Sequence, residues 1–252
     1  MTSTKTSGLG HHFAFGGYLI GGDIQSADMH GGIAPLDVTD ITQSAHSRIG
    51  GLRDGEISVV AYMNPAAAQE HAAFSPLTRA DVLTMYVAGS TVGGPALSQN
   101  SLQLNYDPTR APDGSLTEKV DCQADRYGQE WGVLLTPGPR TDTAATNGAS
   151  YNQGAATAFG AQAYLQAIAL TGTDVTVTIQ HSANNSSWST LMAFTEIVSG
   201  NSNLPQSAQR ISISNSSTVD QYLRAITTTS GGFTSFKFIV AININPIAGV
   251  VF

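Results

Sequence analysis

Short stretches in which apolar and polar residues alternate constrain this chain more than any other feature. In the clearest one, Val175, Val177 and Ile179 alternate with polar residues. A period of two puts one face of a β-strand in a core and the other toward water. Similar strand-like segments lie at 160–170, 174–181, 189–197, 210–215, 220–228 and 235–244. Six strands separated by turns at this spacing predict a β-sandwich in the second half of the chain.

Strand-like runs also fill the first half of the chain. They lie at 13–20, 80–88, 98–106, 115–126 and 128–136. One helix is expected, from Ala66 to Ala73, because this stretch is rich in strong helix formers and ends before Ser75-Pro76. The polar run at 141–153 has no periodicity and marks a boundary. We therefore expect an all-β fold with one short helix, divided into residues 1–148 and residues 149–252.

The charge composition limits the possible partners of the protein. Charged residues make up 12% of the 252 residues, about half the usual share of roughly 25%. A surface with so little charge fits a chain that is covered by copies of itself, and the alternative is a secreted β-protein with few charges. The formal net charge is −7, which argues against electrostatic binding to nucleic acid, because such binding depends on Lys and Arg. An acidic surface can instead lie beside DNA without holding it.

Cysteine and hydrophobicity patterns narrow the class further. The single cysteine, Cys122, lies in an alternating run and is expected to be a buried apolar residue of a strand. The first residues contain no hydrophobic signal segment, and no run of 18 apolar residues occurs. We expect synthesis in the cytoplasm and no membrane partner.

The sequence provides no pattern for catalysis or cofactor binding. It has no G-x-S-x-G motif, no HExxH motif and no phosphate-binding glycine loop. Asp23 would lie on the opposite face of a strand from Asp28 and His30, which argues against a metal site there. The loop DPTRAPDG lacks the spacing of an EF-hand and is expected to be a hairpin turn. We therefore expect no enzyme activity, no cofactor and no metal.

The stretch 36–62 has the most distinctive pattern. It begins with a strand-like run at Leu36, passes through a polar connector with a Gly50-Gly51 break, and reaches Asp54-Gly55. Asp-Gly is a strong turn signal. A second strand is expected at 56–62, where Ile57, Val59 and Ala61 alternate with other residues.

This stretch, LDVTDITQSAHSRIGGLRDGEIS, resembles a segment of siphophage major tail proteins, the subunits of the tail tube. In that family a "DVT" strand leads through a Ser-Ala-rich connector to "GL-x-DG" and a β-hairpin arm. GYLIGGDI is similar to the first tube strand of the family, and NYDPTR, DGSLT and YGQEWG are similar to segments of actinophage major tail proteins. Together these motifs span residues 17–132.

The resemblance implies a structural protein of the virion. Its subunits would form hexameric rings that stack into the DNA conduit of a long non-contractile tail. The partners it implies are other copies of the chain, a tape measure protein, and tail terminator and distal tail proteins. Genomic DNA would pass through without specific binding. The second half of the chain would form a β-sandwich domain on the exterior of the tube.

Five residues are candidate site residues. In the connector, Asp40, Arg48, Arg53 and Asp54 are expected to make the contact between rings; the alternative is a solvated loop. In the second half, SANNSSWSTLMAF resembles both a turn of carbohydrate-binding sandwiches and the C-terminal domain of actinophage tail proteins. Trp188 in this turn is a candidate platform for a sugar, although a Trp at a sandwich edge also fits a core or an interface. The alternative function is a carbohydrate-binding adhesin or decoration protein of a virion.

Overall fold

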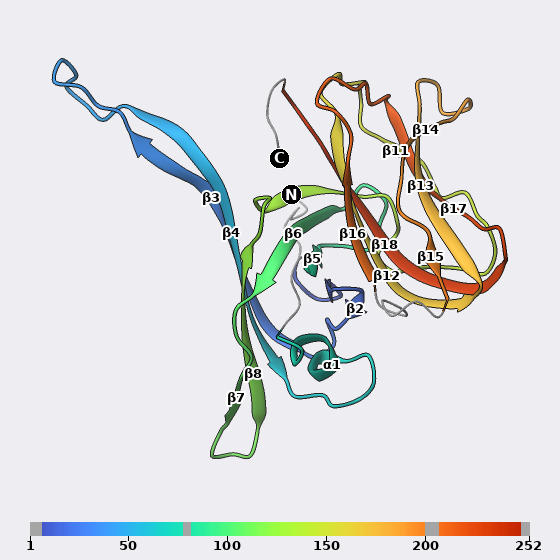
Figure 1. Cartoon of the computed structure of the whole chain (residues 1–252), viewed down its shortest axis with the longest axis horizontal. Helices are drawn as coiled ribbons and strands as arrows, with labels where there is room; N and C mark the ends of the chain where they lie inside the picture. Colours follow the sequence, from blue (N-terminus) through green and yellow to red (C-terminus); the bar gives the residue numbers. More distant parts are fainter. Residues whose placement is uncertain (1–6, 78–81, 200–206, 248–252) are drawn as a thin grey trace, which may run out of the picture.

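The computed structural model describes residues 7–77, 82–199 and 207–247. Within these residues the fold is all-β with one short helix, as the sequence predicts (Figure 1). The helix, α1 Glu70–Phe74, is shorter than expected. Ala68 has a positive φ of 60°, a left-handed conformation that prevents the helix from starting at Ala66.

The larger of two sheets has 13 strands. Its main path runs β16-β12-β18-β9-β6-β5-β1-β2, and β3, β4, β7, β8 and β10 branch from it. The strands are β1 His12–Phe15, β2 Tyr18–Leu19, β3 Ile24–Asp37, β4 Arg48–Tyr62, β5 Val82–Val87, β6 Pro95–Gln103, β7 Asp107–Arg110, β8 Leu116–Ala124, β9 Glu130–Leu134, β10 Arg140–Asp142, β12 Ala161–Gly172, β16 Ser207–Ser212 and β18 Phe233–Ile244.

The main path of the larger sheet curls into a barrel-like form. Met85 of β5, Leu134 of β9 and Tyr164 of β12 are buried in one hydrophobic cluster. Leu19 and Ala208, from strands at opposite ends of the path, both pack against it. The two ends of the sheet therefore share one core.

The smaller sheet covers the outside of β12 and β18. It has five strands, β11 Tyr151–Asn152, β13 Asp174–Ser182, β14 Ser189–Ala193, β15 Ile197–Val198 and β17 Tyr222–Thr228. Val177 of β13 is buried together with Leu165 of β12 and Phe238 of β18 in the largest hydrophobic cluster. Tyr164, the neighbour of Leu165, belongs to the barrel core instead. Because successive side chains of a strand point to opposite faces, β12 is a wall shared by two cores.

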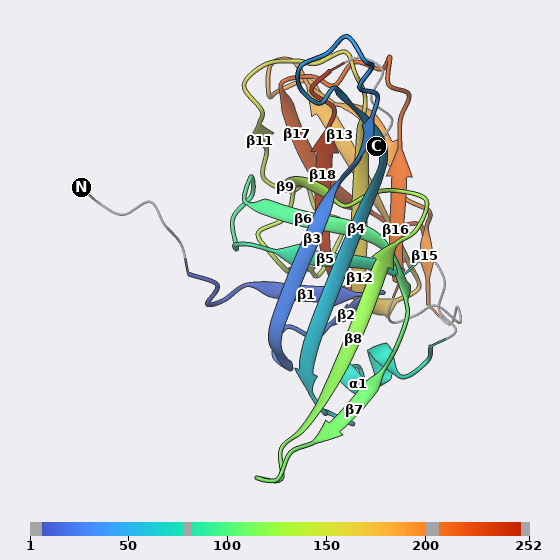
Figure 2. The same cartoon turned by 90° about the vertical axis from the view of Figure 1, so that its left-hand side faces the viewer.

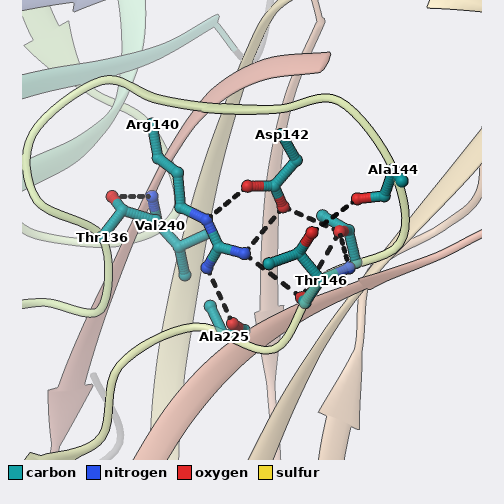
Figure 3. A network of polar contacts seen from close by, with 8 residues as sticks. Thr136, Arg140, Asp142, Ala144, Thr146, Ala225 and Val240 are labelled. Carbon is teal, nitrogen blue, oxygen red and sulfur yellow. Dashed lines mark hydrogen bonds and ion pairs between the residues drawn. The ribbon is translucent and has the colours of Figure 1, made fainter. Parts of the chain in front are cut away.

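A buried ion pair joins the two sheets of this sandwich (Figure 3). Arg140 of β10 donates two hydrogen bonds to the carboxylate of Asp142, each 2.7 Å long. Its remaining nitrogen donates to the carbonyl of Ala225 on β17, at 3.1 Å. Thr227 Oγ1, also on β17, donates to Asp142 at 2.7 Å. Both ionic side chains are nearly buried, so this network fixes β10 against the smaller sheet.

The branch β3-β4-β8-β7 forms a four-stranded antiparallel sheet (Figure 2). Its inner face packs on Phe15 of β1 and Phe74 of α1, in a third hydrophobic cluster. Ile57 and Val59 of β4 are buried there, as their alternation predicts. Cys122 of β8 lies in the same cluster, which confirms its predicted place in a strand core. The segment 107–114 is part of a hairpin, as predicted, but its first four residues form the strand β7, and the turn to β8 begins after Arg110.

Candidate assembly surfaces

The most prominent feature of the molecule is a hairpin arm made of β3 and β4. The two strands pair from Ile24 and Ala61 at the body to Asp37 and Arg48 near the tip. Beyond the four-stranded sheet, the arm projects away from the rest of the chain (Figure 1). We define its outer part, residues 31–54, as the arm, and the loop 38–47 as the arm tip.

The structure corrects one expectation about this stretch. Asp54-Gly55 is not a turn, because β4 continues through both residues and pairs them with Gly32 and Gly31 of β3. A Cβ atom on Gly55 would lie 2.6 Å from Gln99 Oε1 and 2.7 Å from Gln129 Cβ. The glycine is therefore required for close packing of the arm on the body, which is the other common role of a strand glycine. The chain reverses at the arm tip instead.

Hydrogen bonds of its own side chains order the arm tip. Asp37 accepts from Thr39 N at 3.0 Å and from Thr39 Oγ1 at 2.5 Å, and its other carboxylate oxygen lies 2.8 Å from His46 Nδ1. Asp40 accepts in the same way from Thr42. The hydrogen bonds from Thr39 lower the pKa of Asp37, and those from Thr42 lower the pKa of Asp40. Both carboxylates therefore remain charged at neutral pH.

The arm carries apolar side chains that nothing in the described chain covers. Ile41 at the tip is 103% exposed and Leu52 is 86% exposed. The other exposed apolar residues of the arm are Ile33, Leu36, Val38 and Ile49. Such a concentration on one projecting element is typical of an interaction surface.

The four connector residues fall into two groups on the arm. Asp40 lies in the tip loop, and Arg48 pairs with Asp37 where β4 begins. Arg53 and Asp54 lie near the base, where Arg53 donates a hydrogen bond to the carbonyl of Gln129 at 3.2 Å. Asp54 accepts from Gly55 N. The structure therefore places Asp40 and Arg48 near the outer end of the arm and Arg53 and Asp54 near its base.

The four-stranded sheet has two open edges. Among the described residues, β3 pairs only with β4, and β7 pairs only with β8. The open edge of β3 extends over 14 residues. An exposed strand edge presents unpaired N–H and C=O groups, and a second chain can satisfy them.

The outer face of the same sheet is acidic. Because Ile57 and Val59 point to the core, Glu56 and Ser58 point outward. Cross-strand pairing places further charged residues on the same face. In full, the charged residues of the outer face are Asp28, Glu56, Asp107, Lys119 and Asp121, with His30 next to Glu56. The outer face thus carries four carboxylates and one lysine, and Lys119 Nζ lies 3.0 Å from Asp121 Oδ2.

Two buried carboxyl groups lie behind this sheet, and sequence patterns did not indicate their burial. Glu70 of α1 and Glu118 of β8 are 0% and 1% exposed. Burial, together with the nearby charges of Glu118 and Asp23, raises the pKa of Glu70 to about 7. Asn64 N donates to Glu70 and favours the charged form. The burial of Glu118 could not be predicted, because the residue occupies a regular position in an alternating strand.

Trp188 lies beneath an arginine at the edge of the smaller sheet. The guanidinium of Arg224 lies 4.1 Å from the centre of its ring. Arg224 donates two hydrogen bonds to Gln180 Oε1, at 2.9 and 2.7 Å. One face of the Trp188 ring is therefore occupied within the chain.

Two other kinds of feature, a metal-binding cluster and a membrane-spanning helix, are missing from the residues that the structure describes. No group of three or more His, Cys, Asp or Glu residues in this part of the chain is arranged to hold a metal ion. Within the same residues, no helix has the length and apolar character that a membrane crossing requires.

Comparisons with known proteins give only distant likenesses. No protein family and no curated protein sequence matches the chain. A chain from the virion of a native gene transfer agent particle gives a TM-score of 0.43 at 11% identity, over 50% of this chain and 98% of that chain. A chain from the tail of an empty gene transfer agent particle gives 0.36 at 12% identity, over 43% and 81%. The SPP1 Dit protein, described as a hub of the phage adsorption apparatus, gives 0.35 at 10% identity, over 93% and 99%.

These neighbours are virion, tail and hub proteins. Scores this low do not establish a shared function. The function is therefore inferred from the surfaces of this chain and from the motifs in its sequence.

Proposed function

We propose that this chain is the major tail tube subunit of a siphophage, a structural virion protein whose copies form stacked rings around a DNA conduit. One observation is central to the proposal: a four-stranded sheet with an open edge on each side and an acidic outer face. The motifs in residues 17–132 support the same function.

The ring follows from the two open edges. β3 of one copy pairs with β7 of the next copy, so that each copy uses two different edges. A head-to-tail contact of this kind closes into a ring when the rotation per subunit fits a full turn. Closure removes every open edge of the sheet, which is otherwise a liability for a single molecule. The resemblance to siphophage tail proteins implies six copies per ring.

The acidic face of the sheet lines the inside of the ring. The hydrophobic cluster behind β4 and β8 fixes the opposite face toward the body, so the face with Asp28, Glu56 and Asp107 points to the lumen. Phosphates of DNA are repelled by carboxylates, and DNA therefore slides without being held.

The arm connects one ring to the next. It projects from the plane of the four-stranded sheet and exposes apolar side chains from Ile33 to Leu52. In this arrangement Asp40, Arg48, Arg53 and Asp54 belong to the contact between rings. The smaller sheet lies on the exterior of the tube. Tape measure, tail terminator and distal tail proteins are the further partners in the virion.

Electron microscopy of the purified protein tests the proposal. At high protein concentration, negative stain should show rings and tubes with a central channel. Particles that stay monomeric at every concentration, or closed particles without a channel, would contradict it. Glycan binding that is lost in Trp188→Ala would instead support the adhesin alternative.

A further inference from the structure

The structure contains a hollow at the base of the arm that the proposed function has not used. It has a volume of about 550 Å³ and lies between the arm and the body. Ile33 and Arg53 line it from the arm, and Trp131 and Ile247 line it from the body. We name it the Trp131 hollow. We propose that it receives the arm tip of a second copy of this chain, an inference that rests on the proposed function.

The hollow has the residue types that dominate protein interfaces. Trp131 is 56% exposed and Ile247 is 58% exposed, although both lie beside other apolar groups. The Arg53 side chain is partly buried, and its hydrogen bond to the Gln129 carbonyl holds it at the wall. Trp and Arg are enriched among the residues that contribute most to binding energy. The hollow therefore combines an apolar surface with one fixed positive charge.

The arm tip complements this surface in shape and in charge. Ile41 is the most exposed large apolar residue of the described chain, and two aspartates, Asp37 and Asp40, come shortly before it in the arm tip region. Their hydrogen bonds from Thr39 and Thr42 hold the carboxylates in place before any contact forms. An apolar side chain with two carboxylates nearby in the sequence fits an apolar hollow that contains Arg53.

The occupant has to come from another copy. β3 extends four residues from Ile33 in the hollow to Asp37 before the tip begins, a distance of roughly 13 Å. The paired strands keep the arm extended away from the body (Figure 1). The tip therefore does not reach the hollow of its own chain. Each copy has one tip and one hollow, so the contact is head-to-tail, and it produces a filament when the rotation between copies does not close.

Cross-linking between two single variants tests the docking. Ile41→Cys protein and Ile247→Cys protein are mixed, assembled and treated with a short bis-maleimide, and the products are separated on a denaturing gel. The native Cys122 is buried, and burial raises the pKa of its thiol to about 12, so it does not compete. The matched control mixes Ile41→Cys with Leu116→Cys, an exposed position on the β7–β8 hairpin.

We expect a covalent dimer from the Ile41→Cys and Ile247→Cys mixture and at least a tenfold weaker band from the control. Equal bands from the two mixtures, or no dimer from the first, would overturn the docking inference. Microscopy of the same samples decides the proposed function separately. Tubes without the specific cross-link leave the tube function intact and remove only the Trp131 hollow as its receptor.

Discussion

Glu70 shows how a single residue can make the fold sensitive to pH. Its carboxyl group is buried in the core behind the four-stranded sheet, close to Glu118, Asp23 and Tyr106. Burial raises the pKa of Glu70 from its ordinary value of 4.5 to about 7, so the folded state binds the proton more tightly than the unfolded state does. The stability from this proton is complete below about pH 4.5 and is lost as the pH rises to about 7.

Glu70→Gln should therefore reduce the pH dependence of stability. The variant keeps the size of the side chain and cannot ionise, so its melting temperature should change less between pH 5 and pH 8 than that of the parent. The expected difference is on the order of 1 kcal/mol across this range. Thermal unfolding at a series of pH values measures it, with the exposed Glu196→Gln as control. Equal pH profiles for parent and Glu70→Gln would contradict this assignment.

Arg140 should contribute more to stability than any exposed arginine. Arg140→Ala leaves the Asp142 carboxylate buried without its two charged hydrogen bonds. Removing one partner of a buried ion pair costs about 3–5 kcal/mol. Chemical denaturation should show this loss, whereas Arg110→Ala, at an exposed position of β7, should change the free energy of unfolding by less than about 0.5 kcal/mol. A similar effect of both variants would mean that the network in Figure 3 does not hold the sheets together.

At the scale of elements, the arm should be needed for elongation and not for folding. Arg53→Glu places a negative charge in the Trp131 hollow, where the proposed partner brings Asp37 and Asp40. Like charges across an interface cost several kcal/mol. The variant should stay folded by circular dichroism but form only rings or monomers in electron micrographs. Arg53→Lys keeps the charge and should restore part of the elongation, and normal tubes from Arg53→Glu would contradict the role of the arm.

The sequence predicted most elements because their patterns are local. β13 was predicted from strict alternation and β17 from a strand-like run between turns, and Cys122 was placed in a core by its neighbours. Asp54-Gly55 was wrongly predicted to be a turn. Gly55 is instead needed for close packing against Gln99 and Gln129, which are distant in sequence. The Trp131 hollow was beyond prediction for the same reason, since Ile33 and Ile247 meet only in the folded chain. Arg224 over Trp188 is a third contact of this kind.

At the scale of the whole molecule, the acidic face should keep DNA mobile inside an assembled tube. Asp28→Lys combined with Glu56→Lys reverses two exposed charges on the outer face of the four-stranded sheet and leaves its core unchanged. Tubes of this double variant should retain DNA at low salt and release it as salt increases, because the attraction comes from phosphates. A DNA co-sedimentation assay measures the retained fraction, and parent tubes should retain none.

The DNA co-sedimentation assay can also contradict the assignment of the acidic face to the lumen. Double-variant tubes that retain no more DNA than parent tubes would show that the β3-β4-β8-β7 face is not the lumen. Exchange of Glu196 for Lys, on an exposed loop next to the smaller sheet, provides the matched control for a charge change elsewhere on the surface.

The double burial of β12 has a consequence for how this molecule can change over evolution. Its odd-numbered side chains from Ala161 to Ala167 fill the sandwich and Tyr164 fills the barrel, so each buried position of this strand is constrained by one of the two cores. The smaller sheet is consequently not an accessory that lineages can gain or discard by simple fusion or deletion. Truncation before Ala161 would remove β12, β16 and β18 from the barrel. Sequence diversity should therefore accumulate in the loops of the smaller sheet.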